Sequence, residues 1–206
     1  SKKGLKNLET RLRQHKARGM NVDLISKEET KDKTGTSSYH GALFYKDVGT
    51  IQPLAYLRGL AKIAMLKGVE IYQNSPVTSL SYENKAWYFT SGNASISSDA
   101  VIVATNAYNQ GLDNTGKKGF TPIHYFQAAT QPLSNDQLKT ILPGHQGCWD
   151  TAMIMSSFRL DKEGRLIIGS VGSLNKPLAN TIHNRWCHSK LNTLFPQLED
   201  IKLEHS

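Results

Sequence analysis

The first periodic stretch of the chain is amphipathic. Leu5, Leu8 and Leu12 recur at three- and four-residue spacing among many basic residues. This spacing places the leucines on one face of a helix. We therefore predict a helix over residues 5–17 with one core-facing stripe, ending at Gly19.

Further stretches also have the period or the end signals of helices. Ser26 and Glu29 have the spacing of a capping box, in which each residue satisfies a backbone N–H of the other. Pro53 opens the helix with the strongest signal and Gly68 closes it. Apolar residues on two of its faces predict a largely buried helix, with Leu57 inside. The predicted helices are residues 5–17, 26–35, 53–67, 134–142 and 182–195.

Strands are predicted where the period falls to two or where short apolar runs end in turns. These segments are residues 39–45, 69–72, 77–82, 86–90, 125–132, 157–161 and 165–169. Residues 99–105 differ, because they are almost continuously apolar. Such a run is typical of a strand buried on both faces. It predicts a central strand at residues 100–104, with Ile102 buried, in a mixed α/β or α+β fold.

Composition narrows the class of protein. The 206 residues are 38% hydrophobic and 20% charged, as in ordinary soluble globular proteins, and no apolar run has the length of a membrane span. The net charge of +8 is concentrated near the N-terminus, but no aromatic residues alternate with the basic ones there. A solvated helix face is therefore favoured over a nucleic-acid site. Cys148 and Cys187 lie too far apart in sequence for a metal motif, so we expect no metal, free thiols and a cytoplasmic location.

Several segments carry a family resemblance by their order and spacing. They are Gly41-Ala-Leu-Phe, Gly49-Thr-Ile-Gln-Pro-Leu, Lys67-Gly-Val-Glu-Ile, Asn74-Ser-Pro-Val-Thr, Ala100-Val-Ile-Val-Ala-Thr-Asn-Ala-Tyr, Ala129-Thr-Gln-Pro-Leu, Asp150-Thr, Phe158-Arg-Leu and Gly164-Arg-Leu. Together they resemble the FAD-dependent amine and D-amino-acid oxidoreductases, most nearly the gamma-glutamylputrescine oxidoreductase branch. The resemblance implies a substrate-domain β-sheet with flanking helices, plus part of an FAD-binding domain of the D-amino-acid oxidase type. It assigns residues 1–48 and 111–206 to the substrate domain and residues 49–110 to the FAD-binding domain.

The resemblance also implies site residues. Those expected to contact FAD are Val77, Ala104, Thr105 and Asn106, and those expected to bind substrate are Tyr45, Tyr125, Trp149, Phe158 and Arg159. Rigid aromatic walls suit a substrate pocket, and Arg159 suits a carboxylate. Simpler interpretations stay open: a core position for Val77, a turn for Thr105 and Asn106, and a surface ion pair for Arg159. No catalytic residue is identified.

One departure from the family is clear. Family members hold the FAD pyrophosphate on a G-x-G-x-x-G turn, and these 206 residues contain none. We therefore expect a fragment of an enzyme that oxidises an amine or amino acid, such as a gamma-glutamylputrescine-like substrate, by hydride transfer to flavin. The fragment alone should be inactive and should not retain FAD. The alternative is a noncatalytic binding module that keeps the substrate-domain fold and uses its basic N-terminal helix for a protein or nucleic-acid partner.

Overall fold

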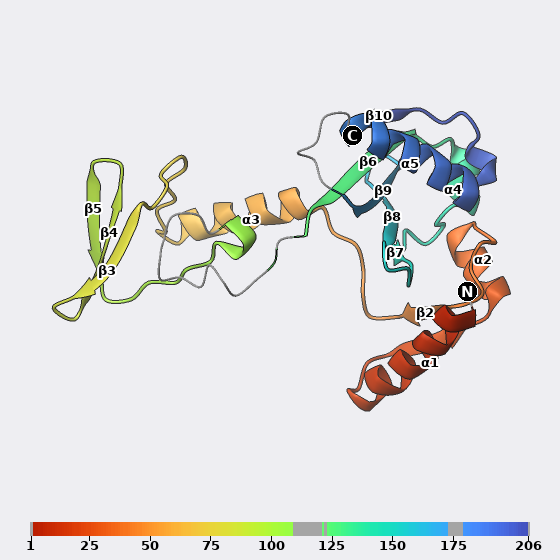
Figure 1. Ribbon diagram of the computed structural model, residues 1–206, viewed down its shortest axis with the longest axis horizontal. Coiled ribbons are helices and arrows are strands. Elements are labelled where there is room, and N and C mark those ends of the chain that lie inside the picture. The colour runs from red at the N-terminus through yellow and green to blue at the C-terminus, as the bar shows by residue number, and fades with distance from the viewer. Residues whose placement is uncertain (1, 109–120, 122, 173–178, 206) are drawn as a thin grey trace. The chain divides into compact units, whose positions relative to one another are not determined.

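The computed structural model describes residues 2–108, 121, 123–172 and 179–205. The chain forms two compact units. The first unit combines Ser1–Gln52 with Ile123–Ser206, and the second is Pro53–Pro122. Figure 1 shows the elements of each unit.

Unit 1 is built on a five-stranded antiparallel sheet with the strand order β10-β6-β9-β8-β7. The strands are β6 Tyr125–Pro132, β7 Cys148–Trp149, β8 Ser156–Leu160, β9 Arg165–Val171 and β10 Leu203–His205. The helices beside it are α4 Asn135–Thr140, α5 Ala179–Leu194 and the 3-10 turn η2 Pro196–Leu198. The three strands predicted from period two, β6, β8 and β9, make up the middle of the sheet.

One face of this sheet is the core of the unit. In β8 every second residue is buried, and β9 follows the same alternation from Arg165 to Ile168, which is the pattern of a sheet with one covered face. The covering residues come mainly from α5 and the turn after it, and Phe195 meets Phe158 edge to face, with 5.4 Å between ring centroids. The buried side chains include Phe126, Ala128, Phe158, Leu160, Leu166, Ile168, Cys187, Leu191, Leu194 and Phe195.

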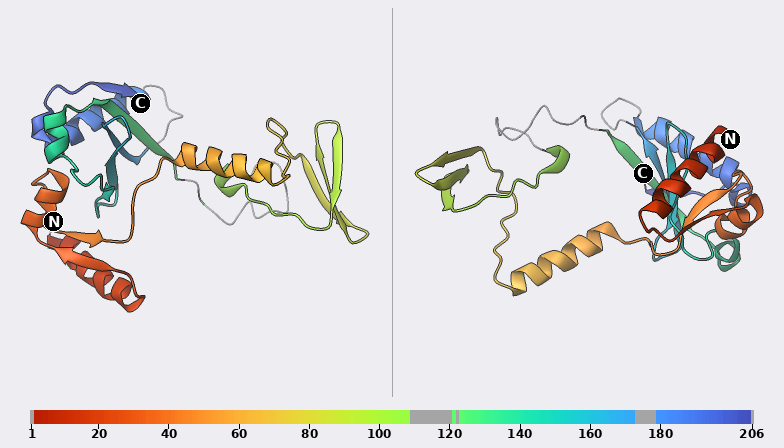
Figure 2. Two further views of the ribbon diagram at one scale, coloured as in Figure 1. Left: turned by 180° about the vertical axis from the view of Figure 1, so that it is seen from behind. Right: turned by 90° about the horizontal axis from the view of Figure 1, so that it is seen from below.

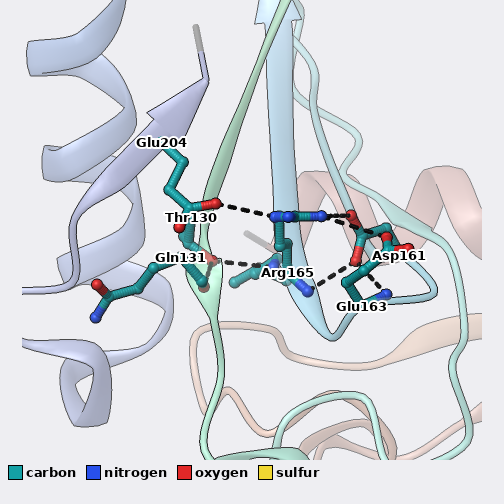
Figure 3. Close-up of polar contacts among 7 residues, drawn as sticks. Thr130, Gln131, Asp161, Glu163, Arg165 and Glu204 are labelled. Atoms are coloured by element: carbon teal, nitrogen blue, oxygen red, sulfur yellow. Dashed lines mark hydrogen bonds and ion pairs between the residues drawn. The ribbon is translucent and has the colours of Figure 1, made fainter.

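The β8–β9 turn is fixed by Asp161 and Arg165. The Asp161 carboxylate accepts hydrogen bonds from the backbone N–H groups of Glu163 and Arg165, at 2.9 and 2.8 Å. The Arg165 guanidinium then contacts Asp161, Glu163 and, across the sheet, Glu204 of β10 at 3.0 Å (Figure 3). One arginine therefore joins the turn to the C-terminal edge strand.

The N-terminal part of unit 1 consists of α1 Lys2–Ala17, β1 Val22–Ile25, α2 Lys27–Thr34 and β2 Ala42–Tyr45. β1 and β2 pair antiparallel and lie beside α1 (Figure 2). The predicted capping box of α2 is present, and the helix ends at Gly35 with a positive φ of 81°. The predicted leucine stripe of α1 is half-buried.

Unit 2 contains α3 Pro53–Leu66, a three-stranded meander and the 3-10 turn η1 Asn106–Tyr108. The strands are β3 Ser79–Glu83, β4 Ala86–Ser91 and β5 Ala94–Ser98. Asn84 and Lys85, between β3 and β4, both have positive φ, as two-residue hairpin turns require. No described residue of unit 2 is buried.

Three sequence-based predictions fail in unit 2. Residues 100–104 form no strand, and Ile102 is 91% exposed. Leu57, expected inside a buried helix, is 62% exposed, and residues 69–72 form no strand. The apolar patterns are real, but burial needs a second layer, and the described part of unit 2 supplies none. Both main sheets are accordingly antiparallel, and residues 100–104 belong to neither.

Candidate active site on the open face of the sheet

The second face of the unit 1 sheet, which we call the open face, is not covered by α5. Its side chains are half-buried or exposed, in alternation with the core residues of the same strands. The N-terminal elements lie across part of this face, and a cavity of about 1440 Å³ is lined by residues of α1, β2, β7 and β8. The cavity is therefore bounded by segments from both ends of unit 1.

Register aligns four residues across the open face. Gln127 of β6 pairs with Gly169 of β9, Gly169 pairs with Ser157 of β8, and Ser157 pairs with Trp149 of β7. Gln127, Ser157 and Trp149 line the cavity. A polar and aromatic row therefore forms its floor.

Gly169 makes room for a tyrosine. A Cβ atom at this position would lie 2.9 Å from Cε1 of Tyr125 and 2.5 Å from the carbonyl oxygen of Phe126. Because the position is bare, the Tyr125 ring lies close over β9 and its hydroxyl hydrogen-bonds with that of Ser157. The pair offers a substrate one donor and further acceptor capacity on the floor of the cavity.

One wall of the cavity is aromatic. The rings of Tyr45 and Trp149 stack with centroids 6.3 Å apart and an interplanar angle of 22°. The Tyr45 hydroxyl lies 2.8 Å from Nδ1 of His15 on α1. This hydrogen bond and this stack link α1 through β2 to the edge of the sheet.

Positive charge dominates the lining. Lys3, Arg11, Lys33, Lys46 and Arg159 line the cavity, against one acidic residue, Asp150. Two of the five cations have partners: Lys46 pairs with Asp23 at 2.6 Å, and the Lys33 ammonium lies 4.3 Å above the Phe44 ring. Among the described residues, the other three form no ion pair. The cavity thus suits an anionic ligand.

Asp150 organises the loop at the edge of this cavity. Its carboxylate accepts hydrogen bonds from the Ala152 N–H at 3.0 Å, the Ser156 N–H at 3.3 Å and the Ser156 hydroxyl, and pairs with Lys190 of α5 at 3.3 Å. Burial alone would raise the pKa of Asp150, but the Ser156 and Ala152 hydrogen bonds and Lys190 outweigh it and lower this pKa. Asp150 is therefore a structural anion beside Trp149.

Two buried polar atoms of the lining have no hydrogen-bond partner among the described residues, the Tyr39 hydroxyl and Oε1 of Gln146. Burial, followed by the nearby charge of Asp150, raises the pKa of Tyr39 well above its ordinary value. The tyrosine therefore stays protonated and keeps a hydrogen to donate. Unpaired buried groups of this kind are satisfied by water or a ligand.

The expected substrate residues lie around one cavity in unit 1. Tyr45, Trp149 and Arg159 line it, and Tyr125 reaches its floor through Ser157. Phe158 is 2% exposed and lies on the core side of β8, between Tyr39 and Phe195, so most of its surface supports the wall from behind.

The expected cofactor residues all lie in unit 2. Ala104, Thr105 and Asn106 are exposed, Val77 has an exposed fraction of 36%, and Asn106 has a positive φ of 47°. Their backbone is therefore accessible to a ligand.

Arg159 forms no ion pair with Asp161, because the Asp161 carboxylate pairs with Arg165 instead.

Sequence reasoning did not identify His15, Ser157, Gln127 and the Asp150–Lys190 pair. Alternation along β8 gave one usable signal, because Ser157 must face away from a core Phe158. No sequence signal pointed to the other residues. His15 contacts Tyr45 across 30 residues of sequence, and Lys190 contacts Asp150 across 40.

Unit 1 thus combines an antiparallel sheet that has one helix-covered face with an aromatic, cationic face over a cavity. Over residues 1–206 the chain matches the family model described as FAD dependent oxidoreductase. The chain belongs to this family. Within the described residues no helix has the length and apolar character to cross a bilayer.

Its relatives are oxidoreductases. The chain is 30% identical over 190 residues to the probable oxidoreductase OrdL of Haemophilus influenzae, covering 90% of the chain and 43% of that protein. It is 26% identical over 185 residues to the gamma-glutamylputrescine oxidoreductase of Escherichia coli, covering 89% of the chain and 43% of that protein. The chain thus spans less than half the length of these relatives.

A solved structure has the same fold. Glycine oxidase from Geobacillus kaustophilus aligns with a TM-score of 0.68 and 13% sequence identity, over 92% of this chain and 50% of the other. This likeness, together with the family match, confirms the predicted fold class: a mixed α/β chain of the type found in these FAD enzymes.

Proposed function

We propose that this chain supplies the substrate-binding part of an FAD-dependent oxidoreductase that oxidises an amine or an amino acid. The observation that carries the proposal is the open face of the unit 1 sheet. There Tyr45, Trp149, Arg159 and the Tyr125–Ser157 hydroxyl pair surround one cavity in a chain of this family. The assignment of residues 1–48 and 111–206 to a substrate domain is part of this proposal.

In this reaction FAD, when bound, accepts a hydride equivalent from the carbon that carries the amine. The chain's own residues bind and orient the substrate. The Tyr45–Trp149 wall excludes water from its apolar part, and the Arg159 guanidinium pairs with a carboxylate. The Tyr125 and Ser157 hydroxyls hold a polar substrate group above the floor, and the Asp150 hydrogen bonds keep Trp149 in place. No residue is proposed to abstract a proton.

The cofactor residues fit one part of a dinucleotide. Small side chains at Ala104 and Thr105 leave their backbone exposed, and the left-handed conformation of Asn106 turns the chain directly after them. Exposed backbone with small side chains is what close approach of a pyrophosphate requires. We propose backbone contacts there and at Val77, which makes residues 49–110 part of the FAD-binding domain. A complete cradle also needs the glycine turn that these 206 residues lack, so the chain alone should neither retain FAD nor turn over.

The name of the Escherichia coli relative guides the choice of substrate. We propose a gamma-glutamylputrescine-like amine, handled in the cytoplasm, as the first compound to test. Its terminal amine is the group that is oxidised, and its carboxylate complements the positive charge of the cavity. The alternative, a noncatalytic module with a basic α1 for a partner, is favoured only by the missing glycine turn.

The test uses a polypeptide that joins this chain to its family's glycine turn. Anaerobic mixing with an amine or amino acid should bleach the flavin spectrum. Arg159→Gln should raise the substrate concentration needed for half-maximal reduction about tenfold or more, since a charge-assisted bidentate contact is lost. Arg13→Gln, outside the cavity lining, is the matched control. A flavin that no amine or amino acid reduces would support the noncatalytic module instead.

A further inference from the structure

One face of α1 forms part of the cavity. Gly4, Leu8, Arg11 and His15 follow one another at four-, three- and four-residue intervals and all line it. This spacing places them on a single helical face. Arg13, two residues after Arg11, points elsewhere on the helix and does not line the cavity. The helix thus presents one arginine to the cavity by its geometry.

Arg11 and Arg159 reach the cavity from different layers of the unit. Arg159 comes from β8 in the floor, whereas Arg11 comes from α1, beside the His15–Tyr45 hydrogen bond. Neither forms an ion pair with another described residue, and the one acidic residue of the lining, Asp150, is paired with Lys190. Two unneutralised guanidinium groups therefore face the same space from two elements.

The cavity that both arginines line suits an elongated ligand. A volume of about 1440 Å³ exceeds the roughly 300–1,000 Å³ of most small-molecule pockets. Leu43, Phe44, Tyr45 and Trp149 contribute apolar surface to the same lining. A methylene chain matches such a surface, and charged groups match the arginines.

The geometry points to a second anion-binding subsite on α1, formed by Arg11. Resting on the proposed function, this subsite makes the preferred substrate an elongated amine that carries a carboxylate far from the reacting carbon. Arg159 holds the acid or polar group at the floor, and Arg11 holds the distal carboxylate. A phosphate would satisfy the same chemistry, but the apolar side chains in the same lining favour an aliphatic acid over a phosphorylated cofactor.

The experiment is a calorimetric titration of the 206-residue chain without flavin. The probes are the dicarboxylates from malonate to suberate, monocarboxylates of the same lengths, and inorganic pyrophosphate. We expect one dicarboxylate length to bind roughly tenfold or more tighter than its monocarboxylate. Arg11→Gln should abolish this advantage and leave monocarboxylate binding unchanged, whereas Arg159→Gln should weaken both. Arg13→Gln removes the same charge from the same helix and should change neither.

Three results would overturn the subsite. They are the absence of a dicarboxylate advantage at every length, equal losses in Arg11→Gln and Arg13→Gln, and pyrophosphate binding more tightly than every dicarboxylate with loss of that binding in Arg11→Gln. The last result would assign Arg11 to a phosphorylated ligand. Because flavin is absent from this titration, its failure leaves the flavin-reduction test of the proposed function intact.

Discussion

Position 169 has no room for a methyl group. The Gly169→Ala variant places a Cβ within 2.5 Å of the Phe126 carbonyl oxygen and 2.9 Å of the Tyr125 ring, so β9 or Tyr125 must shift. We expect the free energy of unfolding to fall by about 1–3 kcal/mol, as overpacking usually costs. Urea denaturation followed by circular dichroism measures it. Gly49→Ala is the control, because nothing lies within 4 Å of its added Cβ, and an equal effect of both variants would refute the steric argument.

Asp150 makes the stability of unit 1 depend on pH, in a direction that its lowered pKa determines. Its pKa is lowered in the folded state, so its contribution to stability is complete above the ordinary value of 3.8 and is lost as the pH falls through the lower folded-state value. At pH 7 we expect Asp150→Asn to destabilise the chain by about 1–3 kcal/mol, since Lys190 and the loop donors lose their charged acceptor.

The difference between wild type and Asp150→Asn should therefore shrink as the pH falls below 3.8. Unfolding curves at a series of pH values test this. Asp32→Asn, at an exposed position of α2, is the control and should stay within about 0.5 kcal/mol of wild type. A difference that is constant from neutral to acid pH would show that the charge of Asp150 has no part in stability.

At the scale of single elements, the cap of α2 is the simplest test. The Ser26 hydroxyl accepts a hydrogen bond from the Glu29 N–H, and the Glu29 carboxylate accepts one from the Ser26 N–H. Ser26→Ala should cost about 1 kcal/mol in thermal or urea unfolding. Ser26→Asn, which keeps a capping oxygen, should restore most of it. If the asparagine variant is as unstable as the alanine one, the cap is not the cause.

Elements with local signals were predicted well. The capping box at Ser26, the closing Gly35 and the β8–β9 hairpin depend on residues a few positions apart, which a sequence shows directly. Strand β10 depends instead on pairing with β6, more than 70 residues earlier, and on the Arg165–Glu204 contact. Site residues divide in the same way, because the family resemblance suggested Tyr45 and Arg159, whereas only the fold places His15 beside Tyr45.

At the scale of the whole molecule, the two units differ in their cores. Unit 1 has a connected core, whereas no described side chain of unit 2 is buried. We expect amide hydrogens of α3 and of residues 69–78 to exchange within seconds, while those of β9 stay protected far longer. Hydrogen-exchange mass spectrometry measures both in one sample. Protection of α3 equal to that of β9 would contradict the separation into a stable and an unsupported unit.

The failed predictions of burial in unit 2 also depend on how elements of the whole molecule pack together. The apolar runs around Leu57 and Ile102 were predicted to be buried, whereas both residues are exposed in the structure. Which layer covers them is decided by contacts between elements, and the pattern of a single segment carries no information about its partner. The sequence analysis therefore inferred burial from apolar character alone, and no described element of unit 2 covers these residues.

Along β8 and β9, residues that stabilise the core alternate with residues that line the cavity. Leu166 and Ile168 are buried in the core, whereas their neighbour Ile167 and the cavity residues Ser157 and Arg159 face the open side. Exchanging an open-face side chain therefore changes what the cavity accepts at little cost to folding, Gly169 excepted. A sheet built in this way can change the ligands that its cavity accepts through single substitutions at every second position, which gives a physical route by which one fold diversifies in specificity.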